Sequence, residues 1–199
     1  MAADAHRTVA ERATASFEVR GSEFLGHVAP VTTVDEAEAF VEAVRAEYAD
    51  ATHNVPAYRV RADPFQEYAS DDGEPSGSAG KPALNVLQGE DLENVAVVVT
   101  RYYGGTNLGV GGLVSAYGRA VKDAVAAAGP VERRPRETVV VTVDYDDSGT
   151  VRSTLESAGV EFDAEYEADV TFEARVPVAD AAALRDRIRS ATSGRAWVE

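Results

Sequence analysis

The segment NVAVVVTRYY, residues 94–103, constrains the fold more than any other part of this 199-residue chain. Its side chains are apolar at every position from Val95 to Val99 and become polar only at Thr100. A strand with one face in water alternates polar and apolar residues, whereas an unbroken apolar run is typical of a strand covered on both faces. The segment therefore predicts a central strand of a sheet.

Strands and a helix are expected before this segment. The sequence around Gly21 indicates two short strands joined by a turn, and residues 55–62 and 65–70 alternate as strands do. Thr33 and Glu36 have the spacing of a capping box, so a helix is expected to begin at Thr33.

A long helix and a domain boundary are expected after the central strand. Apolar side chains recur at helical intervals over residues 113–125, and Gly129 followed by Pro130 is typical of a helix end. We therefore expect a first domain over residues 1–130, followed by VERRPRE, residues 131–137, as a linker.

The second domain is expected over residues 137–199. Its apolar pattern indicates the order strand, helix, strand, strand, helix, strand, which is that of a ferredoxin-like fold. The domain has no histidine, and its carboxylates alternate along the predicted hairpin, so we expect a scaffold or interaction role. The fold class is thus α+β with two α/β sandwich domains, and the second contains strands at 138–145, 161–167, 169–176 and 195–198 and helices at 148–158 and 178–190.

Composition excludes several classes of function. The absence of cysteine excludes disulfides, thiol nucleophiles and thiolate metal sites, and His6, His27 and His53 are too scattered for a zinc motif. We therefore expect no structural or catalytic zinc, and we expect no cofactor. No stretch approaches the roughly 20 apolar residues of a bilayer span, and the N-terminus lacks a signal-peptide pattern. A cytoplasmic protein without a membrane partner is expected.

The charge is unusual, because the formal net charge is −15 and the 19 basic residues are 17 arginines and 2 lysines. Excess acid with almost no lysine suggests the hypothesis of a halophilic protein, in which salt screens the self-repulsion. Neither half of the chain is basic, which argues mildly against a nucleic-acid backbone as the ligand.

The loop SDDGEPSGSAGKPALNVL, residues 70–87, gathers acidic residues, glycines and one of the two lysines ahead of a short helix expected from Pro82. The loop is not a Walker motif, because Pro75 and Pro82 occupy positions that require glycine and a hydroxyl. A dinucleotide fingerprint at Gly109 and Gly111 fails similarly, because Val114 occupies its third glycine position.

Two expected helix starts follow glycine-rich loops, one near Lys81 and one at residues 109–112. Unpaired backbone N–H groups at helix starts attract anions, so these loops could hold an anion with help from Lys81 and Arg101. Tyr102 and Tyr103 could stack on a base or ring. The alternative is structural, since tight loops need glycine and tyrosines at strand ends usually pack in the core.

The acidic residues Asp71, Asp72 and Glu74 have three interpretations. They could pair with Lys81 and Arg101 or cap the loop, they could be solvated, or they could hold a divalent cation, which is the least favoured interpretation.

Histidines offer a candidate general base, because imidazole titrates near neutrality. His27 or His53 could act in this way with a loop carboxylate. The alternative is a buried histidine whose hydrogen bonds are satisfied, which we favour because no Ser/His/Asp arrangement can be located from spacing.

Three segments, ATHNVPAY, YASDDGEPSGSAGKPALNVL and VVVTRYYGGTNLGVGGLVSAYGRA, occur in the order found in the YigZ/IMPACT family. With GSEFLGHVAPV, the resemblance covers about residues 20–128, and residues 138–199 resemble the small C-terminal domain of bacterial and archaeal members. The resemblance implies a first domain like the second domain of small-subunit ribosomal protein five. It implies a second domain similar to the last domain of elongation factor G.

The eukaryotic relatives are regulators of translation that compete for the activator of a starvation-responsive kinase through an additional N-terminal domain, which this sequence does not contain. The resemblance marks a shared binding site without naming its chemistry. The matched residues are His53, Asn54, Asp71, Asp72, Glu74, Ser76, Lys81, Arg101, Tyr102, Gly104, Gly105, Gly109, Gly111 and Gly112.

We therefore predict a non-catalytic, translation-associated regulatory or binding protein. Its expected partners are RNA, a ribosome-associated factor or a phosphate-containing ligand such as a nucleotide, held in a polar groove between the two glycine-rich segments. One alternative is a hydrolase or phosphotransferase that uses His53 or Asp72 as the base. Another is that the matched loops only brace the fold.

Overall fold

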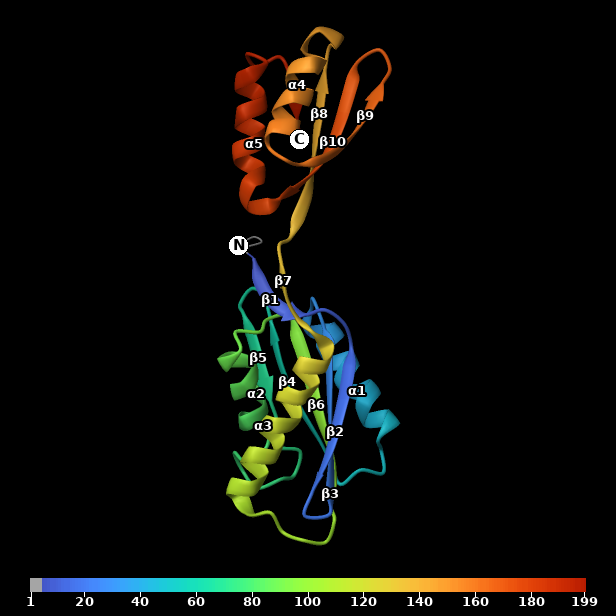
Figure 1. Ribbon diagram of the computed structural model, residues 1–199, viewed down its shortest axis with the longest axis vertical. Helices are drawn as coiled ribbons and strands as arrows, with labels where there is room; N and C mark the ends of the chain where they lie inside the picture. Colours follow the sequence, from blue (N-terminus) through green and yellow to red (C-terminus); the bar gives the residue numbers. More distant parts are fainter. Residues whose placement is uncertain (1–4) are drawn as a thin grey trace. The chain divides into compact units, whose positions relative to one another are not determined.

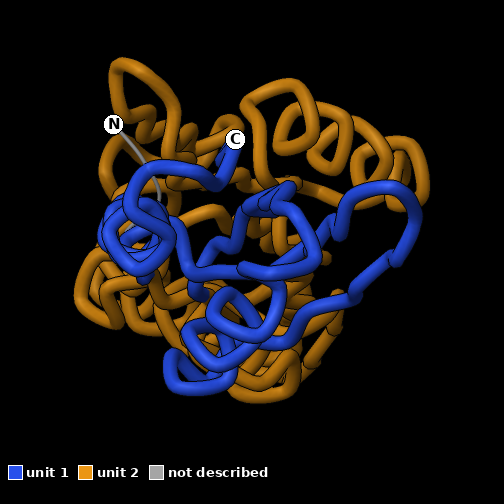
Figure 2. Tube along the Cα trace, turned by 90° about the horizontal axis from the view of Figure 1, so that it is seen from above, with its two compact units in different colours: residues 1–5, 134–199 blue, residues 6–133 orange. Residues whose placement is uncertain are grey.

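The computed structural model describes residues 5–199 and consists of helices and antiparallel sheets (Figure 1). The chain divides into two compact units, of which the N-terminal unit contains residues 6–133 and the C-terminal unit contains residues 134–199 (Figure 2). The α+β class with two α/β units is therefore confirmed. No helix among residues 5–199 has the length and apolar character needed to cross a bilayer.

The N-terminal unit contains a five-stranded sheet in which every neighbouring pair is antiparallel. The strand order is β2-β3-β6-β4-β5. The strands are β2 (Ala13–Val19), β3 (Ser22–Pro30), β4 (His53–Val60), β5 (Gln66–Ala69) and β6 (Val95–Tyr102), and the helices are α1 (Val34–Glu47), α2 (Gly80–Gly89) and α3 (Gly109–Ala128).

Strand β6 lies at the centre of this sheet, as its apolar run predicted. Val95, Val97 and Val99 pack in one core with α2 and α3, whereas Ala96 and Val98 pack in a second core with α1. Helices α2 and α3 therefore cover one face of the sheet and α1 covers the other (Figure 1). Because successive side chains of a strand point to opposite faces, both faces of β6 have to be apolar.

The predicted start of α1 at Thr33 and the predicted end of α3 at Gly129 are both confirmed. The Thr33 side chain accepts a hydrogen bond of 3.1 Å from the Glu36 backbone N–H at the start of α1. Helix α3 ends at Ala128, and Gly129 follows with a φ of +71°, a left-handed conformation that favours glycine.

The predicted linker is partly a strand. Strand β7 (Pro130–Arg133) pairs antiparallel with β1 (His6–Val9), and together they form a two-stranded sheet in the N-terminal unit. The linker interpretation of residues 131–137 is therefore wrong for residues 131–133, which pair with β1, and for residues 136–137, which begin strand β8 (Arg136–Val143).

The C-terminal unit has the strand order β11-β8-β10-β9 with all pairs antiparallel, which is the ferredoxin-like arrangement. The alternate residues Val139, Val141, Phe172 and Ala174 pack against α4 and α5. The elements are β8 (Arg136–Val143), α4 (Tyr145–Ser157), β9 (Glu161–Tyr166), β10 (Val170–Pro177), α5 (Val178–Ala191) and β11 (Trp197–Val198).

Candidate functional site

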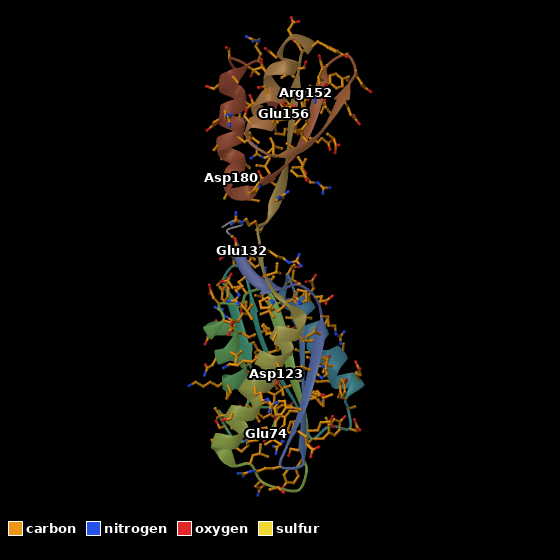
Figure 3. All side chains as sticks on the ribbon, viewed as in Figure 1. Glu74, Asp123, Glu132, Arg152, Glu156 and Asp180 are labelled. Carbon is orange, nitrogen blue, oxygen red and sulfur yellow. The ribbon has the colours of Figure 1, made fainter. Side chains whose placement is uncertain are left out.

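A buried carboxylate lies where the loop of residues 70–79 meets the sheet of the N-terminal unit. Glu74 Oε1 accepts hydrogen bonds from Arg101 Nη1 at 2.6 Å and from the Tyr117 hydroxyl at 2.7 Å. The side chains of Glu74 and Arg101 are only 4% and 6% exposed. Figure 3 shows Glu74 beside the N-terminal half of α3, the helix that carries Tyr117. We call Glu74, Arg101, Tyr117 and His53 the buried polar cluster.

The strand register places the cluster on the face covered by α2 and α3. Arg101 of β6 is paired with His53 on β4 and with Phe24 on β3, so these three side chains form one row across the sheet. The Arg101 guanidinium lies over the rings of Phe24 and Tyr103, at 5.5 and 5.4 Å from their centroids. Such contacts stabilise a cation that has been removed from water.

His53 connects the cluster to the acidic loop. Its Nδ1 atom lies 2.7 Å from the Asp72 carbonyl oxygen, which can only accept, so Nδ1 carries a proton and donates it. The other ring nitrogen, Nε2, is directed at Glu74 Oε2 at 3.8 Å. Both nitrogens of His53 are therefore directed at groups of the same loop.

Tyr117 is a donor that is not among the predicted site residues, because it falls within the apolar helical stripe of residues 113–125. Burial and then the hydrogen bond to Glu74 raise the pKa of the Tyr117 hydroxyl well above its usual value, so the hydroxyl keeps its proton and remains a donor. A tyrosine among alanines and valines on a buried stripe is itself a signal, because a buried hydroxyl needs a partner.

Asp72 ties the loop to two further elements. Its Oδ2 atom accepts a hydrogen bond of 2.7 Å from the Asn54 backbone N–H, and its Oδ1 lies 3.5 Å from Arg45 Nη2 on α1. The Asp72 backbone is left-handed, with a φ of +48°, which a short polar residue tolerates better than most. Both carboxylate oxygens of Asp72 are thus engaged inside the unit.

Asp71 caps helix α2. Its carboxylate accepts hydrogen bonds from the backbone N–H groups of Gly77, Ala79 and Gly80, at 2.8 to 3.1 Å. Partial burial opposes ionisation, but the three backbone donors outweigh it and lower the pKa of Asp71. The expected anion site at the start of α2 is therefore occupied by a carboxylate of the chain itself.

Lys81 and Ser76 lie apart from this cluster. Both side chains are exposed, and Lys81 has no ion pair or hydrogen bond within residues 5–199. The buried serine of the loop is Ser78, whose hydroxyl donates to the Pro75 carbonyl at 2.6 Å. The structure thus joins Arg101, but not Lys81, to the acidic loop.

The second glycine-rich segment, residues 103–114, consists of the loop before α3 and the first turns of that helix; apart from Leu113 it is exposed or half-buried, and we call it the glycine loop. Gly105, Gly109 and Gly111 are exposed, and a side chain at any of them would meet open space. Gly112 is half-buried beside the Leu108 side chain. Gly104 differs, because a Cβ there would lie 1.9 Å from the backbone of Gly21, so glycine is required for the two loops to meet.

Apolar side chains and no charges mark the glycine loop. Tyr103, Val110 and Val114 are 45%, 57% and 40% exposed. None of the residues 103–114 is acidic or basic, in a chain with 27% charged residues. Tyr102, just before the loop, is half-buried, and its hydroxyl donates to Asp50 at 2.9 Å.

The opposite face of the sheet carries a chain of hydrogen bonds that contains Asn54. The Thr100 hydroxyl donates to Asn54 Oδ1 at 2.7 Å, which leaves its oxygen to accept from His27 Nε2 at 3.2 Å. His27 Nδ1 then accepts from the Thr14 hydroxyl at 3.0 Å. Burial lowers the pKa of His27 to about 4. A neutral histidine inside the unit is not a base that a substrate can reach.

No group of three or more histidine and acidic side chains in the described part of the chain is arranged to hold a metal ion.

Ser22 is a further residue that sequence analysis missed. Its hydroxyl oxygen accepts from Arg101 Nη2 at 3.4 Å and from the Gly104 N–H at 3.1 Å, so it connects the cluster to the glycine loop.

Comparison with known proteins gives two matching domain models. The Impact N-terminal domain matches residues 20–125, and a domain of unknown function, DUF1949, matches residues 141–195. IMPACT family member YvyE from Bacillus subtilis is 35% identical over 193 residues, covering 96% of this chain and 89% of that protein.

Two further comparisons differ in extent. Protein IMPACT from Rattus norvegicus is 37% identical over 95 residues, or 45% of this chain and 29% of that protein. A crystal structure described as that of a hypothetical protein is 33% identical with a TM-score of 0.67, covering 98% of this chain and 96% of that chain.

Proposed function

The chain belongs to the IMPACT family, and from this premise we propose that it is a non-catalytic, translation-associated regulatory protein that binds a ribosome-associated protein through its glycine loop. The resemblance to IMPACT proteins implies the role in translation. The matched domain, residues 20–125, contains both the buried polar cluster and the glycine loop.

One observation carries the proposal: the three carboxylates of the acidic loop, Asp71, Asp72 and Glu74, are engaged with groups of the same unit. Glu74 is buried between Arg101 and Tyr117, and both oxygens of Asp72 have partners inside the unit. A general base has to reach the proton of a substrate. Glu74 is buried, and the candidate bases His53 and Asp72, whose side chains are 20% and 32% exposed, are hydrogen-bonded within the unit. This arrangement supports a brace for the loops rather than a hydrolase or phosphotransferase.

The surface of the glycine loop supports a protein as the partner. A nucleic acid is held mainly by cations on its phosphates, and the glycine loop has none. Tyr103, Val110 and Val114 instead offer exposed apolar area, the kind of surface that protein interfaces bury. Exposed glycines let a partner's backbone approach closely.

The outward face of the C-terminal sheet also disfavours RNA as the partner. Side chains alternate along a strand, so residues 161, 163 and 165 of β9 and 173 of β10 point away from the helices. These residues are Glu161, Asp163, Glu165 and Glu173. Arg136 and Arg175 lie on the same face, where the four carboxylates outnumber them, and such an excess of acid repels a long phosphate backbone.

Sedimentation with purified ribosomes tests the proposal. Val110→Glu places a charge at the centre of the glycine loop, and Val131→Glu, at an exposed valine of β7, is the matched control. We expect the wild type and Val131→Glu to sediment with ribosomes and Val110→Glu to remain in the supernatant. Equal sedimentation of all three folded proteins would show that the glycine loop does not mediate ribosome binding.

Two further measurements address the alternatives. Binding of ribosome-free RNA that is lost in Val110→Glu would replace the protein partner with RNA. A metabolite screen of the wild type and His53→Ala tests the enzyme: a compound turned over only by the wild type would contradict a non-catalytic function.

A further inference from the structure

A cavity of about 430 Å³ lies at one end of the C-terminal unit. It is formed where β8 and β9 begin, where β10 ends and where α5 starts, and Asp180 marks this end in Figure 3. Every residue that lines it belongs to the C-terminal unit. Its volume is in the range of pockets that hold small molecules.

Three arginines line this cavity, and they are unusual in this unit. Arg136, Arg175 and Arg187 have no hydrogen bond, ion pair or ring contact within residues 5–199. Other arginines of the unit are engaged: Arg152 with Tyr166, Arg185 with Glu137, Arg189 with Asp186 and Arg195 with Asp147. The guanidinium groups without a partner are thus gathered around one cavity.

The cavity has an excess of positive charge although the chain carries −15. Its three arginines face two carboxylates, those of Glu161 and Asp180, and neither carboxylate forms an ion pair with them. Glu161 lies opposite Arg175 in the β9–β10 register and offsets part of its charge without forming an ion pair with it. Guanidinium groups left in this state are suited to bind an anion in bidentate geometry.

Apolar side chains form the remaining wall. Leu184 lies one turn from Asp180 and one turn from Arg187, so α5 presents a single face to the cavity, and Pro177 and Val160 close the other side. A wall of this kind binds the organic part of a ligand, while the arginines orient its charge.

We propose that this cavity is a binding site for a small phosphorylated organic molecule of about mononucleotide size. A phosphate presents three acceptor oxygens and up to two charges, which matches a cavity lined by three guanidinium groups better than a single carboxylate does. The site is separate from the glycine loop, so its failure would leave the proposed function untouched.

The test uses the full chain, labelled with ¹⁵N and titrated to millimolar concentrations of adenosine 5′-monophosphate, ribose 5-phosphate or adenosine. The variants are Arg175→Gln and Arg187→Gln, with Arg189→Gln as the control on the same helix. Thermal unfolding of each variant confirms that it is folded.

We expect both phosphates to shift amide signals at residues 158–161 and 175–187 and adenosine to shift none. Because a hydrogen bond to a charged group contributes strongly, each cavity variant should weaken binding about tenfold or more. Arg189→Gln should leave the Kd unchanged. The proposal would be overturned if neither adenosine 5′-monophosphate nor ribose 5-phosphate bound, or if the amide shifts were confined to other residues. It would also be overturned if Arg189→Gln raised the Kd as much as the cavity variants do.

A single-stranded oligoribonucleotide and a tricarboxylate serve as competitors. We expect that neither competitor, at matched concentration, displaces bound adenosine 5′-monophosphate. If only the oligoribonucleotide or only the tricarboxylate bound at these residues, a small phosphorylated molecule would be the wrong class of ligand.

Discussion

Glu74 and Arg101, which are 27 positions apart in the sequence, form a hydrogen-bonded ion pair of 2.6 Å with both side chains almost completely buried. Glu74 Oε1 also accepts from Tyr117, so one carboxylate oxygen joins the acidic loop to strand β6 and helix α3. The pair therefore fixes the loop of residues 70–79 against the start of the glycine loop.

Removing one partner of this pair should destabilise the protein strongly. Glu74→Gln leaves the Arg101 cation buried without its counter-charge, which costs about 3–5 kcal/mol for buried pairs. The control is Asp123→Asn, which breaks an exposed pair with Arg119 on α3 and should cost less than about 1 kcal/mol. Urea denaturation gives the free energy of unfolding of each variant. Similar losses in the two variants would show that Glu74 is no brace.

Gly104 should not tolerate a side chain. A Cβ at this position lies 1.9 Å from the backbone of Gly21, so Gly104→Ala forces the two loops apart and should cost about 1–3 kcal/mol. Gly111→Ala is the control, because its Cβ would meet no atom within 4 Å. We expect thermal unfolding to show a lower Tm for Gly104→Ala alone, and an unchanged Tm would contradict the close approach.

His27 should make the protein less stable as the pH falls. Burial lowers its pKa in the folded protein to about 4, below the value of 6.5 in an unfolded chain. Between these two values the unfolded chain binds the proton first, so the free energy of unfolding falls as pH decreases through this window. The full loss is about 3 kcal/mol.

The measurement is the free energy of unfolding at pH 7 and pH 4.5, in the wild type and in His27→Gln. Carboxylates titrate in both proteins, so the difference between them isolates His27, to which Glu47 and Arg12 are the charged neighbours. We expect a smaller loss in the variant. An equal loss of unfolding free energy in the two proteins would mean that the pKa of His27 is not lowered by folding.

Salt should stabilise this chain. A net charge of −15 repels itself at low ionic strength, and the Debye length falls from about 10 Å in 0.1 M salt to about 3 Å in 1 M salt. The hypothesis of a halophilic protein predicts a Tm that rises from dilute buffer to molar KCl. An equal Tm in both conditions would count against it.

The sequence predicted those parts of the fold that have a local pattern. The apolar run of β6 indicated a central strand because both faces of the strand are covered, and the end of α3 followed from Gly129 and Pro130. Strands β1 and β7 have only four residues each, and they exist because they pair with each other across the whole N-terminal unit. No local pattern contains that information.

The candidate site was predictable only as a list of residues. Sequence analysis left open whether the acidic loop pairs with Arg101, and the pairing depends on a cross-strand register that spacing does not reveal. Tyr117 and Ser22 were missed because each belongs to an element that appeared purely structural. Lys81 was grouped with Arg101 by charge, although its side chain is exposed and lies outside the cluster.

Contact between the glycine loop and a ribosome-associated protein can be tested directly by crosslinking. Because the chain has no cysteine, Val110→Cys gives a single thiol for a photoactivatable crosslinker, and Val131→Cys gives a matched control. Irradiation of the labelled proteins bound to purified ribosomes should join position 110, but not position 131, to one ribosomal or ribosome-associated protein. Crosslinks to RNA alone, or equal crosslinking from both positions, would contradict the account.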